Sequence, residues 1–324
     1  MQLRRFAVWT AVTLIAAGFT SSGLAQSYPS KPVRGIVSFA AGGQNDFVAR
    51  VVGQKLSERW GQQVVIENRP GANGNMGTEA VVNAAPDGYT IYFALQTLAG
   101  NAVVAPTPAF DPRKDLAPVT LIGFAEAVIV VNPTIPVKTV LDLVRHAKEN
   151  SGKLYYGATT VGSAGQIGME VLKSITGLPI EMVPYKNIGN LIADIVAGRV
   201  SVYFTPVTPV LPLIQSGKLR AIGVTGAKRL SMLPDVPTIR ESGLTTFEVT
   251  SWYGLFTPIR TPRDIQAKLN ADMRWALDQA DVRTRLTEGG IEPKASTPEE
   301  LRTVVDRDIQ QLEELVRRGA IKPI

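Results

Sequence analysis

A strand, a tight glycine turn and a helix follow one another in residues 35–60, and this stretch constrains the fold more than any other. Residues 36–39 form a short apolar run typical of a strand, and apolar residues recur at helical spacing from Phe47 to Leu56. Between them, Gly42 and Gly43 allow backbone conformations that other residues avoid. The pattern predicts a strand–turn–helix unit of an α/β protein.

The start of this predicted helix is a candidate anion site. Asn45 or Asp46 can cap the helix, and the preceding small residues, Ala41, Gly42 and Gly43, let the backbone approach a ligand closely. The free amides of a helix N-terminus carry about half a positive charge, so they can hold a carboxylate or phosphate without lysine or arginine. The alternative is a purely structural turn, which is common in α/β proteins.

The N-terminal residues predict export. Arg4 and Arg5 precede an apolar run at residues 6–19, and Gly23 and Ala25 supply the small residues that precede a cleavage site. A membrane span would need about 20 apolar residues, which this run lacks. We expect residues 1–25 to be a cleaved signal peptide, with a mature periplasmic protein that starts at Gln26.

Size and composition indicate two globular domains and exclude several functions. The chain has 324 residues, 45% of them hydrophobic, and single cores rarely grow beyond about 250 residues. Without Arg4 and Arg5 the formal charge falls from +6 to +4, and the basic residues are scattered, so nucleic acid is not an expected partner. The absence of cysteine excludes disulfides, thiolate metal sites and a lipid-anchored cysteine after the signal.

Alternating strand and helix patterns continue along the chain and predict parallel βαβ units, with breaks at residues 110–114 and 116–118. We expect strands at 63–67, 89–95, 154–157, 181–185, 200–204 and 219–225, and helices at 76–85, 141–149, 166–175 and 190–197. Three further helices are expected at 261–278, 280–289 and 297–318. Two of them open with Thr-Pro, where we expect the threonine to cap the helix and the proline to take its first position. One crossing between domains is placed near Val131 and the other at 248–256. The predicted domains are 26–130 with 250–324, and 131–249.

A second loop resembles the first in its chemistry. Thr159, Thr160, Gly162 and Ser163 follow the strand at 154–157 and precede the helix at 166–175. Ligands of open α/β sheets bind beyond the carboxyl ends of the strands. The two loops, one in each domain, are therefore predicted to face each other and hold one anion.

The groups that an enzyme would need are missing. Ser163 stands in VGSAG, where Val161 replaces the glycine that a G-x-S-x-G elbow has two residues before its serine. The single histidine, His146, lies on an amphipathic helix where we expect it to be solvated. No S-x-x-K, H-E-x-x-H, Walker A or EF-hand pattern occurs, although distant carboxylates could still meet in space. We predict no catalytic residue, no metal site and no cofactor.

Several short motifs in a fixed order resemble the Bug family, the extracytoplasmic solute receptors of tripartite tricarboxylate transporters. They are YPSKPVR at 28–34, FAAGG at 39–43, ENRPGANGNMG at 67–77, APDGY at 85–89, VPYK at 183–186, GKLRA at 217–221, LPDVPT at 233–238 and SWYGL at 251–255. The resemblance covers the whole mature chain. It implies a type II periplasmic binding protein, in which two α/β domains joined by two crossing strands close around a small carboxylate.

The resemblance also assigns the two loops to the ligand and suggests its class. Family members bind a carboxylate through loops that correspond to residues 41–46 and 159–163, largely by backbone amides and water. This chain has Thr205 where the family commonly has an aspartate, and Ala41, Gln166 and Asn187 replace the family's usual proline, histidine and glycine. The missing acid disfavours a ligand with an ammonium group. The expected ligand is a di- or monocarboxylate without an amine, aromatic acids included.

The resulting hypothesis is a monomeric periplasmic receptor that delivers an organic acid to the membrane subunits of a transporter. Its predicted ligand-binding residues are Ala41, Gly42, Gly43, Asn45, Asp46, Thr97, Thr159, Thr160, Gly162, Ser163, Tyr185 and Thr205, with Asp46 acting mainly by ordering its loop. For each hydroxyl, the alternative is a local turn or cap bond. The alternative function is a sensor subunit that presents its closed state to a signalling partner, and the neighbouring genes would separate the two.

Overall fold

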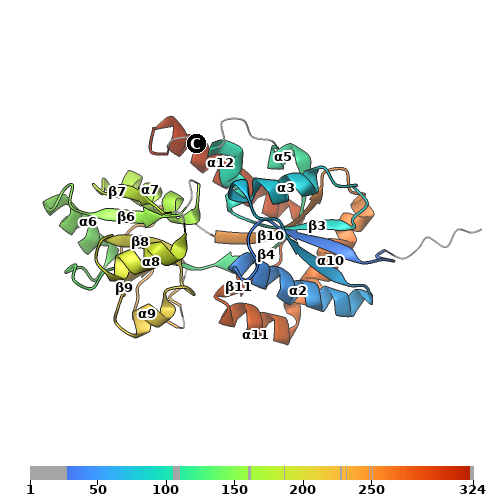
Figure 1. Ribbon diagram of the computed structural model, residues 1–324, viewed down its shortest axis with the longest axis horizontal. Coiled ribbons are helices and arrows are strands. Elements are labelled where there is room, and N and C mark those ends of the chain that lie inside the picture. The colour runs from blue at the N-terminus through green and yellow to red at the C-terminus, as the bar shows by residue number, and fades with distance from the viewer. Residues whose placement is uncertain are drawn as a thin grey trace, which may run out of the picture. The chain divides into compact units, whose positions relative to one another are not determined.

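Two β-sheets with helices on both faces make up the computed structural model (Figure 1). The structure describes residues 28–104, 110–159, 162–185, 187–226, 228–230, 232–247, 249 and 251–321. Residues 31–324 form one compact unit and residues 1–30 another. The predicted signal peptide, residues 1–25, lies outside the described residues.

Sheet A contains the strand of the opening sequence motif. Its described strands are β1 (Val33–Val37), β2 (Val64–Asn68), β3 (Thr90–Leu95), β4 (Leu116–Ala125), β10 (Ser251–Pro258) and β11 (Ile291–Pro293), in the order β11-β4-β10-β3-β1-β2. β1 runs parallel to β2 and β3, whereas β10 is antiparallel to both β3 and β4. The loops after β1 and β3 therefore leave the same edge of the sheet.

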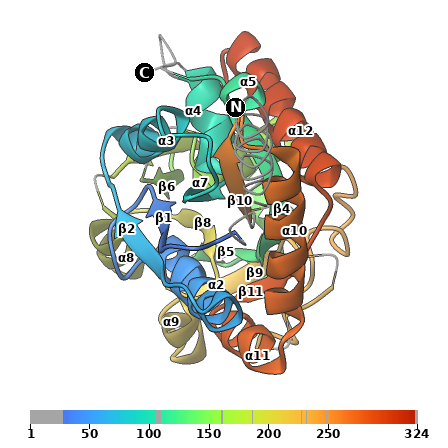
Figure 2. The ribbon, with the colours of Figure 1, turned by 90° about the vertical axis from the view of Figure 1, so that its right-hand side faces the viewer.

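Helices cover both faces of sheet A, as Figure 2 shows. One face carries α2 (Gln44–Trp60), α10 (Arg263–Asp278) and α11 (Ala280–Glu288). The other carries α3 (Asn75–Val82), preceded by the short helix η1 (Ala72–Gly74), together with α4 (Thr97–Val104) and α12 (Pro298–Arg317). A one-turn helix, α5 (Pro112–Asp115), leads into β4.

Sheet B is built from the middle of the chain. Its described strands are β5 (Ala127–Val131), β6 (Tyr155–Ala158), β7 (Glu181–Pro184), β8 (Val202–Pro206) and β9 (Arg220–Val224), in the order β7-β6-β8-β5-β9. The helices of this region are α6 (Val140–Glu149), α7 (Ala164–Thr176), α8 (Ile188–Val196) and α9 (Leu211–Gln215). Along β5, Ile129 and Val131 pack with α6 and α7, whereas Val128 and Val130 pack with α8, as the two-residue period of a strand requires.

The two sheets share one topology. In sheet A the order β2-β1-β3-β10 places an antiparallel strand beside the third strand, and in sheet B the order β7-β6-β8-β5 does the same. Each of these antiparallel strands, β10 and β5, is the first strand after the chain crosses over from the other sheet. β1 with α2 is therefore equivalent to β6 with α7, so the two predicted binding loops occupy matching positions.

Two helices belong to both hydrophobic cores. In α12, Leu301 and Ile309 pack in the core of sheet A, whereas Leu312 and Leu315 pack in that of sheet B. In α4, Leu98 and Ala99 lie in the first core and Val104 lies in the second. The helices α4 and α12 also contact each other, so they connect the two cores in addition to the passages of the chain.

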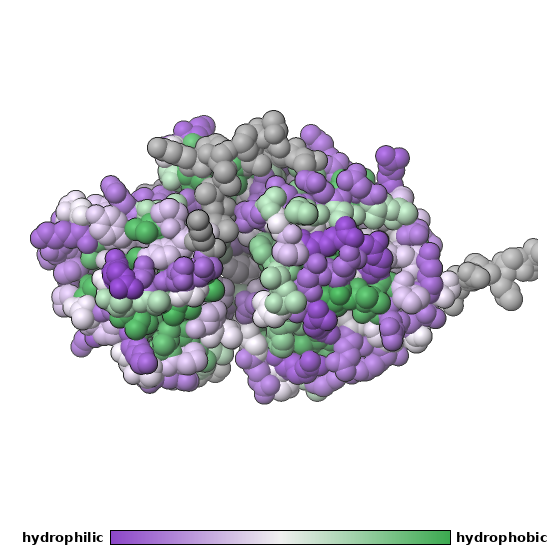
Figure 3. Space-filling model, in the orientation of Figure 1, coloured by the Kyte–Doolittle hydropathy of each residue, from purple (hydrophilic) through white to green (hydrophobic). Residues whose placement is uncertain are grey.

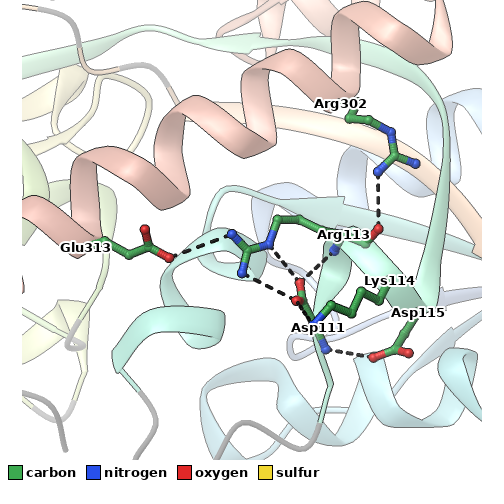
Figure 4. Close-up of polar contacts among 6 residues, drawn as sticks. All are labelled: Asp111, Arg113, Lys114, Asp115, Arg302 and Glu313. Carbon is green, nitrogen blue, oxygen red and sulfur yellow. Dashed lines mark hydrogen bonds and ion pairs between the residues drawn. The ribbon is translucent and has the colours of Figure 1, made fainter.

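Charged side chains fasten α5 to α12 (Figure 4). The Arg113 guanidinium lies 3.7 Å from Glu313 and donates hydrogen bonds to Asp111, and Arg302 donates 3.2 Å to the carbonyl of Arg113. Burial opposes ionisation of Asp111, but these bonds from Arg113 outweigh it, and the pKa of Asp111 lies below its ordinary value. The side-chain pairs are largely exposed, so each adds little to stability.

Three local features differ from the sequence predictions. The strand Ala127–Val131 lies entirely in sheet B, so the first passage between sheets falls at Glu126 and not near Val131. Thr297 caps α12 as expected, but α10 begins after Pro262 without a cap from Thr261. Pro118 lies inside β4 instead of breaking it, because β11 pairs only with residues 123–125 and no second neighbour there needs its missing N–H.

Apolar residues gather over α8 and α9 on the face of the molecule that Figure 3 shows. Ile188 is 40% exposed, and Ile192, Leu213 and Ile214 are partly exposed around it. Among the residues that the structure describes, no helix has both the length and the apolar character needed to span a membrane.

Candidate functional site

The first loop turns sharply after β1 and is fixed by its own helix. Gly42 has φ +82°, a conformation that L side chains rarely adopt, and its N–H donates 2.9 Å to the Asp46 carboxylate. A Cβ atom on Gly42 would meet nothing within 4 Å, so backbone conformation and not space requires glycine here. Ala41 and Gly43 are exposed beside it. This bond from the Gly42 N–H is consistent with the predicted role of Asp46 in ordering the loop, which stays a prediction.

A buried carboxylate therefore stands at the start of α2. Asp46 is 4% exposed, and Arg50 lies 2.9 Å from its carboxylate oxygens. Burial alone would raise the pKa of Asp46, but hydrogen bonds from Arg50 and from the Gly42 amide outweigh it, and the pKa lies below its ordinary value. Asp46 is thus ionised at neutral pH, with Arg50 balancing its charge.

The first turn of α2 leaves backbone donors beyond the end of β1. Phe47 N–H makes the first helical bond, 3.0 Å to Gly43, so the amides of Gln44 and Asn45 precede the helical ladder. Asn45 is 4% exposed and donates 3.0 Å to the carbonyl of Phe93 in β3. Its side chain thus joins α2 to the sheet. The N-cap of α2 is Gly43, with no side-chain cap bond, so the prediction that Asn45 or Asp46 caps this helix is wrong.

The second loop has the same hydrogen bond, from a glycine N–H to a side chain four residues later, but its acceptor is neutral. Gly162 has φ +74°, and its N–H donates 2.8 Å to the amide oxygen of Gln166, four residues later. Ser163 is the N-cap of α7, where its hydroxyl accepts 3.3 Å from the Gln166 N–H and keeps its own proton free to donate. Thr159 is half-buried after β6, and Thr160 lies outside the described residues.

Thr97, Tyr185 and Thr205, the predicted residues outside the two loops, lie in different surroundings from one another. Thr97 is half-buried at the first position of α4, a helix that the sequence did not predict. Tyr185 donates 2.7 Å to Asp194 on α8, and burial together with this carboxylate raises its pKa to about 12. Thr205 is 0% exposed within β8. Of the three, only Thr97 starts a helix at the same sheet edge as the first loop.

Two sets of contacts connect the loops to the opposite sheet. Backbone atoms of Gly162 lie against Gly100 of α4, so close that a Cβ on Gly100 would be 2.8 Å from the Gly162 carbonyl oxygen. At the first loop, the Gln44 side chain donates 3.5 Å to the hydroxyl of Thr208 in the sheet B region. Gln44 also accepts 2.8 Å from the Tyr253 hydroxyl and donates 3.0 Å to the Gly289 carbonyl, to which Thr208 donates at 3.1 Å.

Sequence reasoning missed four of these residues, Gln44, Gly100, Gln166 and Thr208. Gln166 was noted only as a departure from a family pattern, although its position four residues after a glycine repeats that of Asp46 after Gly42. The repeated spacing is the signal that would have found it. Among the described residues, no group of three or more His, Cys, Asp or Glu could hold a metal ion.

The fold and the paired helix starts define a two-sheet receptor of the periplasmic binding protein class, and comparison with known proteins identifies its family. The family model of the tripartite tricarboxylate transporter family receptor, TctC, matches residues 48–320. The chain belongs to this family. Its family and structural neighbours are solute-binding receptors and not enzymes, which confirms the prediction that the protein is not an enzyme.

Three solved structures resemble the chain over nearly its whole length. The periplasmic binding protein BugD is 30% identical and covers 91% of this chain and 99% of its own, with a TM-score of 0.77. Rpa4515 from R. palustris with adipate is 32% identical, covers 92% of this chain and 100% of its own, and has a TM-score of 0.81. MatC (Rpa3494) from Rhodopseudomonas palustris with bound malate is 33% identical, covers 89% and 100%, and has a TM-score of 0.75. The predicted family and periplasmic binding protein fold are confirmed.

Proposed function

We propose that this periplasmic receptor captures a small di- or monocarboxylate and delivers it to the membrane subunits of a tripartite tricarboxylate-type transporter. The observation that carries the proposal is the repeated helix start: in both sheets a glycine at positive φ is locked by a side chain four residues later. Each lock orients the first turn of a helix of more than ten residues, whose amides favour an anion. Relatives with bound adipate and malate support a carboxylate as that anion.

The carboxylate is proposed to bind between the two loops. The amides of Gly42 and Gly162 already donate to side chains, so the donors offered to the ligand are those of the next residues, Gln44 and Asn45 in α2 and Ala164 and Gly165 in α7. The Ser163 hydroxyl adds a side-chain donor. Ala41, Gly43, Thr97, Thr159, Thr160, Tyr185 and Thr205 remain proposed lining residues.

The remaining assignments follow from this role. Residues 1–25 are proposed to be the cleaved signal peptide that exports the chain, and the mature protein is proposed to act as a monomer. The domain that carries the first loop is proposed to comprise residues 26–130 and 250–324, and the other domain residues 131–249. Because β5 lies in sheet B, the first boundary moves to Glu126, and the residues of β5 join the second domain. Ligand binding would favour a closed arrangement of the two domains, which the transporter would recognise.

A thermal-shift screen of mono-, di- and tricarboxylates, aliphatic and aromatic, tests the proposal. An acid at 100 times its dissociation constant stabilises a folded receptor by about 2.7 kcal/mol, which raises Tm by roughly 5 °C for a chain of this size. We expect such a rise with at least one di- or monocarboxylate, followed by a measured Kd from titration calorimetry. No shift with any acid in the screen would exclude the proposed ligand class.

The variant Gly42→Val with Ser163→Ala locates the site. Valine is strained at φ +82°, and alanine removes the Ser163 hydroxyl, so the ligand-induced shift should disappear. A matched control combines Gly217→Val, at φ +71° with nothing within 4 Å of its Cβ, and Thr297→Ala, which removes the N-cap of α12. The control should keep the shift. Loss of the shift in both, or in neither, would place the ligand elsewhere.

A further inference from the structure

Gly100 and Gly162 bring two backbones unusually close together across the two sheets. A Cβ on Gly100 would lie 2.8 Å from the carbonyl oxygen and 3.4 Å from the Cα of Gly162. In the reverse direction, a Cβ on Gly162 would lie 3.3 Å from the Cα of Gly100 and 3.5 Å from a methyl of Val104. Any side chain at position 100 would therefore have to displace the loop or the helix.

The helix side of this contact is the firmer one. Leu98 and Ala99, just before Gly100, are buried in the core of sheet A, and Val104, one turn later, is buried in that of sheet B. Asn101 exchanges two hydrogen bonds with Asn73, of 2.7 and 2.8 Å. Because α4 is held by both cores and by this pair, a clash at position 100 would move the loop and not the helix.

The loop side leads directly to the proposed anion donors. The Gly162 carbonyl faces Gly100. The Gly162 N–H donates to the side-chain oxygen of Gln166, and the backbone N–H of Gln166 donates to the Ser163 hydroxyl. A shift of Gly162 would therefore carry the cap and first turn of α7 with it. Glycine inside a helix is otherwise unfavourable relative to alanine, so local helix stability does not explain Gly100.

We propose that Gly100 is a positioning residue for the receptor: its missing side chain lets Gly162 dock on α4 and so sets where the start of α7 meets the ligand. This inference rests on the proposed carboxylate site. Gly100 itself touches no ligand. It acts by fixing the depth at which the Gly162–Gln166 segment lies against α4.

The variant Gly100→Ala tests this, with Gly189→Ala in α8 as the matched control. Both are helical glycines, but a Cβ on Gly189 would meet only the Asn187 side chain, at an ordinary 3.5 Å. Calorimetric titration with adipate and with malate, as the probes, measures Kd, and the Tm of the ligand-free protein measures stability. For whichever acid binds, we expect Gly100→Ala to raise Kd by at least tenfold without lowering the ligand-free Tm. Gly189→Ala should change Kd by less than twofold.

Hydrogen–deuterium exchange of the ligand-free protein gives a readout that does not depend on the acid. Amides of residues 162–166 should exchange faster in Gly100→Ala, whereas those of α4 should be unchanged. Unchanged exchange at 162–166, an unchanged Kd, or failure of Gly100→Ala to fold would each overturn the inference. If the wild-type protein binds no carboxylate, the proposed ligand class fails, and the exchange experiment alone then decides whether Gly100 positions this loop.

Discussion

In both loops a glycine at positive φ donates its N–H to a side chain four residues later, but the two loops are stabilised in different ways. In the first, the Gly42 amide is bound by the charged carboxylate of Asp46, which Arg50 neutralises, and the glycine faces open space. In the second, the Gly162 amide is bound by the neutral side chain of Gln166, and the glycine packs against α4. One loop is ordered by charge and the other by packing.

This difference explains how the proposed anion site could contain a carboxylate. Asp46 would repel a bound acid if its charge were not balanced, but Arg50 contacts it from the next turn of the same helix. The ion pair leaves the helix amides as the main positive potential of the loop. In the second loop the acceptor, Gln166, is neutral and would not repel a bound acid. Close packing of Gly162 against α4 stabilises this loop in place of a charged hydrogen bond.

The largest effect is expected from removing the charged lock. Asp46→Ala deletes the acceptor for Gly42 and the carboxylate that pairs with Arg50, which keeps its bond to Asn68. Since hydrogen bonds to charged groups contribute about 1.5–3 kcal/mol and Arg50 is half exposed, unfolding free energy should fall by about 2 kcal/mol and ligand affinity by about 30-fold. Urea unfolding and calorimetric titration measure the two.

Asp46→Asn is the control for that experiment because it gives the first loop the neutral acceptor of the second. It should retain most of the affinity that alanine loses. If both variants bind like wild type, charge does not order the first loop and the comparison fails.

A smaller effect is expected from removing the neutral lock. Gln166→Ala deletes the acceptor for Gly162, and a neutral hydrogen bond contributes about 1 kcal/mol, so affinity should fall by about fivefold. Gln166→Glu keeps an acceptor but adds negative charge at the start of α7, so it should weaken anion binding more than alanine does. Equal affinity in the two variants would show that the loop is not exposed to the charge of the ligand.

Much of the fold could be predicted from periodicity and turn residues. The strands that precede both loops, the helices that follow them and the Thr297 cap were expected close to where they occur. These elements have either a clear apolar period or a cap residue, and such signals depend only on neighbours in sequence. An ordering role for Asp46 could be proposed from its place at the helix start, but its bond from the Gly42 amide, four residues earlier, was not foreseen.

The parts that were missed depend on partners distant in sequence. The residues of α4, TLAGNAVV, show no apolar period, because the helix is packed on several sides by two cores. The apolar run of β5 is equally compatible with either sheet, so the passage at Glu126 could not be distinguished from one near Val131. Gly100 has meaning only beside Gly162, which lies 62 residues later in the chain.

The cap of the second loop gives a further, smaller test. Ser163→Ala should lower unfolding free energy by about 1 kcal/mol through loss of the N-cap, and the distant cap variant Thr297→Ala should cost about the same. Only Ser163→Ala should also weaken carboxylate binding, by roughly threefold, if its hydroxyl proton donates to the ligand. Matching affinities in both variants would reduce Ser163 to a structural cap.

The smallest effect is expected from acid, and it separates the loops by charge. The pKa of Asp46 is lowered from 3.8 in the folded protein, so its contribution to stability is present above the unfolded-state pKa and is lost as pH falls through the folded value. Many carboxylates titrate in this range, so only differences between variants are informative. Between pH 5 and about 3, wild type and Gln166→Ala should lose stability in parallel, whereas Asp46→Asn should lose less, by under about 1 kcal/mol. Parallel loss in all three would mean that the Asp46 carboxylate gains nothing from Arg50 and Gly42, and that the two loops are ordered in the same way.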